Sequence, residues 1–131
     1  MIDFKTKTEH IVLEKDSIVH CTVLKGAYMD LSDAKENLEA IKILSKGKKV
    51  SVLVDIIKSK GISQKSRAYF ESDEAEEIQS ACALLIWPPL SKLIGNFFIG
   101  FNKTKFPTKF FTEEPEARKW LSSFNVCYIY K

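Results

Sequence analysis

The chain contains few of the residues that mark a disulfide framework or a metal site. Its 131 residues include three cysteines, four prolines and five glycines. The cysteines, Cys21, Cys82 and Cys127, are odd in number, and none belongs to a C-x-x-C pair or another metal-ligand spacing. We therefore expect reduced thiols in the cytoplasm, with no disulfide, no metal and no other cofactor.

An excess of charge of one sign is also absent. The chain has 20 Lys and Arg against 17 Asp and Glu, a net charge of +3 and a pI of about 8.7. A dedicated nucleic-acid domain usually has a pI above about 9 and one dominant basic face. Here charges of both signs are mixed along the chain, so nucleic acid is not an expected partner.

Targeting and cofactor-binding motifs are missing from the sequence as well. Residues 1–10, "MIDFKTKTEH", lack the apolar core of a signal peptide, and no lipidation motif is visible. No phosphate-binding Walker loop and no glycine fingerprint for a dinucleotide occurs. With 45% hydrophobic and 28% charged residues and no linker or repeat, the chain is expected to form one domain over 1–131.

The longest apolar stretch is residues 81–101, "ACALLIWPPLSKLIGNFFIGF". It has the roughly 20 residues that a membrane span needs. However, an interior proline costs a helix about 3 kcal/mol, and a central lysine such as Lys92 costs about 2.5–3.5 kcal/mol on insertion. The Pro-Pro pair instead predicts a buried strand over 79–87 followed by a helix over 89–102, and no transmembrane segment.

The predicted helix over 89–102 is amphipathic, with its apolar residues spaced three and four apart. Three of them are the phenylalanines Phe97, Phe98 and Phe101. We expect these rings to cover the core of the domain. An exposed docking face is the alternative, and a gap beneath the rings would suit an acyl chain.

The remaining pattern alternates strands and helices. It predicts an α/β fold of order ββαβαβαβα with about four helices, right-handed crossovers and a mixed sheet that is mostly parallel, with an antiparallel first hairpin. The expected elements are a hairpin of strands 10–15 and 18–24, a helix over 31–44 ended by Gly47, a central strand 49–57, a short helix from Ser63, an acidic turn 73–77, a strand 108–111 and a helix 113–124. The last apolar segment, 126–130, is either an edge strand or a packed tail.

Element order and local sequence resemble the STAS domain, the fold of SpoIIAA-type anti-sigma-factor antagonists. The segments that carry the resemblance are "VLVDI" (52–56), "ACALLIWPPLSKLIGNFFIGFNK" (81–103) and "PTKFFTEEPEARKWL" (107–121). They are similar to a largely uncharacterised bacterial branch, SpoIIAA-like or STAS/SEC14-like. The resemblance implies a four- to five-stranded sheet with helices packed on it.

The resemblance implies a phosphoswitch. In the sporulation antagonists, a serine at the start of the helix after the third strand is phosphorylated, which switches binding to a partner kinase. Ser63 and Ser66 lie at the matching place, so Ser63 is a candidate phosphosite. The antagonists carry an Asp-Ser-Ser-Gly-like motif there, whereas this chain reads "SKGISQKSR".

In an open α/β sheet, ligands bind beyond the carboxyl ends of the strands. The predicted order gathers the loops 24–30, 57–63, 87–90 and 111–113 at that edge. It predicts an anion- or peptide-binding site formed by Tyr28, Lys58, Lys60, Ser63, Ser66, Arg67 and Trp87. The alternative is that Ser63 only caps a helix and that the lysines are solvated.

Signals for catalysis are weak, and we expect no enzyme. His20 and Cys21 are adjacent in a strand and therefore point to opposite faces. A hairpin symmetric about residues 15 and 16 would place His10 opposite Cys21, although no third group or oxyanion hole accompanies the pair. Asp55, at the end of the central strand, is expected to cap a loop.

Two functions from different classes follow. The first is a non-catalytic, cytoplasmic STAS-like regulatory module that binds a protein partner or itself as a homo-oligomer. The second is a SEC14-like protein that binds a lipid or an anionic metabolite. Basic residues in 46–49 and 102–105 are expected to compensate the acidic segment 71–77, and an electrostatic contact with an acidic protein or a lipid headgroup is the alternative.

Overall fold

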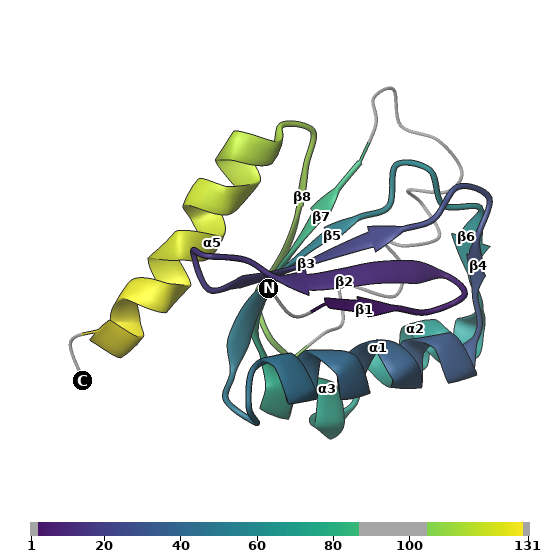
Figure 1. The fold of residues 1–131 in the computed structure, drawn as a ribbon, viewed down its shortest axis with the longest axis horizontal. Coiled ribbons are helices and arrows are strands. Elements are labelled where there is room, and N and C mark those ends of the chain that lie inside the picture. Colours follow the sequence, from purple (N-terminus) through teal and green to yellow (C-terminus); the bar gives the residue numbers. More distant parts are fainter. Residues whose placement is uncertain (1–2, 87–104, 130–131) are drawn as a thin grey trace.

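The computed structural model describes residues 3–86 and 105–129, with side chains described as far as Phe124 (Figure 1). A six-stranded sheet of order β1-β2-β3-β5-β7-β8 is accompanied by a two-stranded sheet of β4 and β6. The elements are β1 (Asp3–Lys5), β2 (Glu9–Leu13), β3 (Ile18–Val23), β4 (Tyr28–Met29), α1 (Leu31–Leu44), β5 (Val50–Asp55), β6 (Gly61–Ile62), α2 (Gln64–Phe70), α3 (Asp73–Ile78), β7 (Gln79–Leu85), β8 (Thr108–Phe111) and α5 (Glu114–Ile129).

The predicted α/β class and mixed sheet are confirmed, but the predicted strand number was too low. β1 and β2 are antiparallel, as are β2 and β3, whereas β3, β5, β7 and β8 run parallel to their neighbours. The prediction missed β1, β4 and β6 because two or three residues are too few to show an alternating pattern. The described residues contain four helices: three were expected, and the fourth, α3, forms where an acidic turn was expected at 73–77.

Helices cover both faces of the large sheet. α1, α2 and α3 lie on one face and α5 lies on the other (Figure 1). The first face forms the larger core, which includes Ile11, Val52 and Leu84 together with Ile41 of α1. The second face forms a smaller core in which Leu53 and Ala83 pack with Leu121 of α5. The two central strands, β5 and β7, are therefore buried on both faces, as their near-continuous apolar sequences predict.

The turn between β2 and β3 fixes the register of the hairpin. The Glu14 N–H donates to the Ile18 carbonyl, and the Ser17 N–H donates to the Glu14 carbonyl. Ser17 has a φ of +64° and so forms a bulge-type turn with one residue in the left-handed region. This extra turn residue shifts the pairing by one position from the symmetric prediction, so that Ile11 pairs with Cys21.

α1 begins and ends as its sequence predicts. Asp33 in the first turn accepts a hydrogen bond from the Asp30 N–H (2.9 Å), as in a capping box. At the other end Gly47 has a φ of +78°, and its N–H donates to the Lys42 carbonyl. The face toward the sheet is apolar and includes Ala34, Leu38, Ile41 and Leu44.

Arg118 ties α5 to the β2–β3 turn. Its guanidinium contacts Glu14 (2.7 Å) and Asp16 (3.2 Å) of the turn, and Glu114 (2.9 Å) one turn earlier on the helix. These charges are partly exposed, so the network orients the helix more than it stabilises the fold. α5 continues to Ile129, so residues 126–129 are helical and do not form the edge strand that was one of the two expectations. No glycine or proline follows Phe124 to end the helix.

The buried strand predicted at the start of the apolar run is confirmed for residues 79–85. β7 ends at Leu85, and Ile86 is buried directly after it. Trp87 and the predicted helix over 89–102 lie outside the described residues. Within residues 3–86 and 105–129, no helix is long and apolar enough to cross a membrane.

Leu121 tests the contribution of the second core, because its side chain is fully buried beneath α5. Replacing it by alanine should lower the free energy of unfolding by about 2–5 kcal/mol, through lost transfer energy and a cavity. Urea unfolding followed by circular dichroism measures the change. Lys119→Ala, at an exposed position of the same helix, is the matched control and should change stability by less than about 0.5 kcal/mol.

Candidate functional site

The carboxyl ends of the parallel strands meet at one edge of the sheet, as the predicted order requires. The loops after β3 and β5 are joined there by backbone hydrogen bonds. The Gly26 N–H donates to the Lys58 carbonyl (2.9 Å), and the Lys60 N–H donates to the Ala27 carbonyl (2.8 Å). β4 and β6 pair in the same region, with Tyr28 opposite Gly61. The two loops therefore form one connected surface.

This surface, which we call the basic edge, consists of Leu24, Lys25, Tyr28, Lys58 and Lys60. Tyr28 and Leu24 are 50% and 41% exposed, which is unusual for large apolar side chains in this structure. The three lysines are exposed beside them. Tyr28, Lys58 and Lys60 were predicted to meet here, whereas Leu24 was missed because it reads as the last residue of an apolar strand.

Ser63 and Ser66 hold the start of α2. The Ser63 hydroxyl accepts the Ser66 N–H (3.1 Å), which is the predicted cap. Ser66 is fully buried, and its hydroxyl donates to the Asp30 carbonyl (3.1 Å). Ser66 therefore stabilises the fold and is not accessible to a partner, contrary to its place in the predicted site. Arg67 and Ser63 are half-buried, and phosphorylation of Ser63 stays a prediction.

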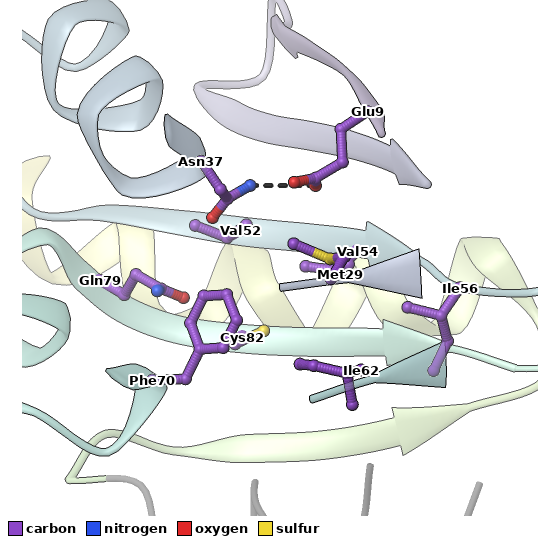
Figure 2. A pocket seen from close by; sticks show the side chains of 10 residues that line it. All are labelled: Glu9, Met29, Asn37, Val52, Val54, Ile56, Ile62, Phe70, Gln79 and Cys82. Atoms are coloured by element: carbon purple, nitrogen blue, oxygen red, sulfur yellow. Dashed lines mark hydrogen bonds between the residues drawn. The ribbon is translucent and has the colours of Figure 1, made fainter. Parts of the chain in front are cut away.

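A small cavity lies between the sheet and the helices of the first face (Figure 2). Its volume is about 20 Å³, which is enough for about one water molecule and too small for an acyl chain. The predicted space beneath the helix 89–102, and the place of Trp87, lie outside the described residues. The residues that line the cavity are Glu9, Met29, Asn37, Val52, Val54, Ile56, Ile62, Phe70, Gln79 and Cys82.

Glu9 is the unexpected group in this cavity. Only 1% of the residue is exposed, and the Asn37 side-chain amide donates to its Oε2 (3.0 Å; Figure 2). Its other oxygen, Oε1, has no hydrogen-bond partner among the described residues. Burial raises the pKa of Glu9 to about 8, against the lowering effect of the Asn37 hydrogen bond, and the nearby carboxylates of Asp33 and Glu36 add to the rise. Glu9 is therefore mostly a neutral acid at neutral pH.

The sequence carries a signal for this pair that the prediction did not use. Glu9 alternates with Ile11 and Leu13, so its side chain points toward the first face of the sheet. Asn37 falls within the apolar stripe of α1, beside Leu38. A polar residue at a buried position of an apolar stripe indicates a buried polar contact. Glu9 of β2 and Asn37 of α1 form such a contact with each other.

Cys21 and Cys82 are buried thiols rather than nucleophiles. Burial raises the pKa of Cys21 well above its usual range and that of Cys82 to about 12. Both are therefore protonated at neutral pH and weakly reactive. The predicted contact of Cys21 with His10 is wrong, because the shifted register places His10 opposite Thr22. Cys21 instead lies 3.5 Å from the Asn37 side-chain nitrogen.

Two predicted structural roles are confirmed. The Asp55 carboxylate accepts the Ile57 N–H (3.0 Å) and so caps the loop after β5. Lys105 forms an ion pair with Asp73, which agrees with compensation between the basic residues at 102–105 and the acidic segment.

Comparisons with known proteins place the fold but no activity. The family model described as "Domain of unknown function (DUF7793)" matches residues 11–125. A solved structure of an uncharacterised protein of the DUF3478 family from Shewanella loihica PV-4, described as having a SpoIIAA-like fold, is similar over 86% of this chain and 91% of its own, with a TM-score of 0.58 and 18% identity. The predicted SpoIIAA-like fold is thereby confirmed.

A second solved structure, of a protein of unknown function from Arthrobacter sp. FB24, is 33% identical. It covers 86% of this chain and 97% of its own, with a TM-score of 0.35. No curated protein matches the chain.

The buried Glu9 predicts an unusual pH dependence of stability. Its pKa rises from 4.5 to about 8 on folding, so the folded state keeps a proton that the unfolded state releases. The resulting stabilisation, on the order of 4 kcal/mol, is complete below about pH 4.5 and is lost as pH rises to about 8. Urea unfolding at a series of pH values measures this slope.

Glu9→Gln keeps the shape and the neutral state at every pH, so its stability should stay nearly level over the same range. Glu39→Gln removes an exposed carboxyl from α1 that does not contribute to the raised pKa of Glu9, and it is the control, with a profile close to wild type. A wild-type profile that stays level between about pH 5 and 8 would contradict the assignment.

Proposed function

The chain belongs to the DUF7793 family of domains of unknown function, and we propose that it is a cytoplasmic, non-catalytic regulatory module. In this proposal the basic edge binds an acidic segment of a partner protein that also carries apolar side chains. The observation that carries the proposal is the exposure of Tyr28 and Leu24 among lysines on two loops that are held together.

The geometry of the basic edge supports a protein ligand. A small anion would use the lysines alone and would leave Tyr28 and Leu24 in water. A peptide with both acidic and apolar side chains would engage both kinds of group, and tyrosine is among the residues enriched at the centres of protein interfaces. Because backbone hydrogen bonds already fix the loops, binding would require little ordering.

The charge balance of the loops supports an acidic partner. The segments 24–30 and 56–63 contain Lys25, Lys58 and Lys60, and Asp30 is their only acidic residue. Such a surface attracts acidic chains and raises the rate of association at low salt. The interaction should therefore weaken as the salt concentration rises.

The state of the two described cysteines supports a function without covalent chemistry. Both thiols are protonated at neutral pH and buried in the core. Asp55 caps a loop and Ser63 caps a helix. Asp55 and Ser63 thus have structural contacts that account for them.

A charge-reversal pair tests the proposal. Lys58→Glu/Lys60→Glu should abolish capture of a partner that wild-type protein enriches by crosslinking from cell lysate, because it turns the basic edge acidic. Lys48→Glu/Lys49→Glu makes the same change of net charge at exposed positions of another loop and should leave the capture unchanged. Quantitative mass spectrometry of the crosslinked peptides is the measurement.

Support requires both the selective loss and crosslinks that map to Lys25, Lys58 or Lys60 in the wild-type complex. Equal capture by the two double variants would contradict binding at this surface. The absence of any enriched partner in wild-type samples would contradict the proposed function itself.

A further inference from the structure

The strand β1 forms one edge of the large sheet in the part of the chain that the structure describes. The turn between β1 and β2 shows which backbone N–H and C=O groups of β1 point toward β2 and which point away from the sheet. The Thr6 N–H donates to the Glu9 carbonyl (2.9 Å), so Thr6 and Glu9 are a hydrogen-bonded pair. Because such pairs alternate in an antiparallel ladder, Phe4 is the next residue whose N–H and C=O point toward β2. The N–H and C=O groups of Asp3 and Lys5 therefore point away from the sheet.

The sequence of β1, Asp3-Phe4-Lys5, is complementary to itself. If two copies pair antiparallel about a two-fold axis at Phe4, Asp3 of each copy lies opposite Lys5 of the other. This register pairs all three residues. The outward backbone groups of Asp3 and Lys5 then meet as a hydrogen-bonded pair, and the two Phe4 side chains lie at the closer, non-bonded position. The registers that pair Asp3 with Asp3, or Lys5 with Lys5, place like charges opposite each other.

A surface groove lies beside β1 and would also be covered by such pairing. Its volume is about 620 Å³, and it is lined by Phe4, Lys5, Thr6, Lys35, Glu36, Glu39, Ala40, Ile43, Tyr69 and Glu74. Ile43 is 53% exposed, which is more than any other large apolar side chain among the described residues. A two-fold axis normal to the sheet keeps both α1 helices on the same face, so the second copy's α1 would lie toward this groove and cover Ile43.

We propose that β1 joins two copies of this chain into a symmetric dimer with one continuous twelve-stranded sheet, twice the six strands of one copy. The interface is isologous, because the same three residues serve both copies. It uses a different surface from the basic edge and stands independently of the function proposed there. A three-residue strand is short for an edge, so the dimer is weak and its population depends on concentration.

Charge exchange at β1 tests the pairing. Lys5→Asp places aspartate opposite Asp3 twice in each dimer, and Asp3→Lys places lysine opposite Lys5 twice. Each single variant should therefore dimerise at least about tenfold more weakly than wild type. An equimolar mixture of the two variants restores opposite charges at both positions and should form a heterodimer. Sedimentation velocity from about 10 μM to 1 mM measures each dissociation constant.

Lys25→Asp is the matched control, since it makes the same change of charge at the basic edge and should dimerise like wild type. Circular dichroism checks that each variant is folded. Formation of a heterodimer in the mixture is a second, independent check, because unfolded variants could not pair. Weaker dimerisation of each single variant, together with a heterodimer in the mixture, supports the proposal. A wild-type protein that is monomeric at 1 mM, or single variants that dimerise as well as wild type, would overturn it.

Discussion

The parallel pairing of β5 with β3 and β7 is the constraint on which the rest of the structure depends. β5 and β7 are apolar on both faces and can be buried only if helices cover the sheet from both sides. Parallel strands need crossover connections, and α1 lies in the one between β3 and β5. The carboxyl ends of β3, β5, β7 and β8 therefore lie at the same edge of the sheet. The joined loops of the basic edge, and the cavity under the helices of the first face, both follow from this one pairing.

The sequence predicted the elements whose patterns are long. The fourteen residues of α1 show its apolar stripe, its acidic first turn and its terminal glycine, and the fold class follows from the alternation of such segments. Ser63 as a cap and Asp55 as a loop cap were also predictable, because short polar side chains at element ends bond to nearby backbone groups. The meeting of Tyr28 with Lys58 and Lys60 required only the correct order of strands.

Other features depend on single residues that no pattern isolates. One extra turn residue, Ser17 with positive φ, shifts the whole β2–β3 register and separates His10 from Cys21. The burial of Ser66 depends on the exact angle at which α2 meets the Asp30 carbonyl. The raised pKa of Glu9 depends on how completely two packed elements exclude water, and sequence alternation gives the direction of a side chain but not its distance from solvent.

The network around Arg118 has a consequence for how the chain is synthesised. Its contact with Asp16 joins residues 102 positions apart, and Leu121 closes the same core over Ile18. On the ribosome, the first hairpin therefore emerges long before the helix that covers its second face. Until then Ile18 and Leu53 present an uncovered apolar surface, which is the kind of surface that chaperones bind. Such long-range closure also makes the final docking of α5 a slow step compared with formation of the hairpin itself.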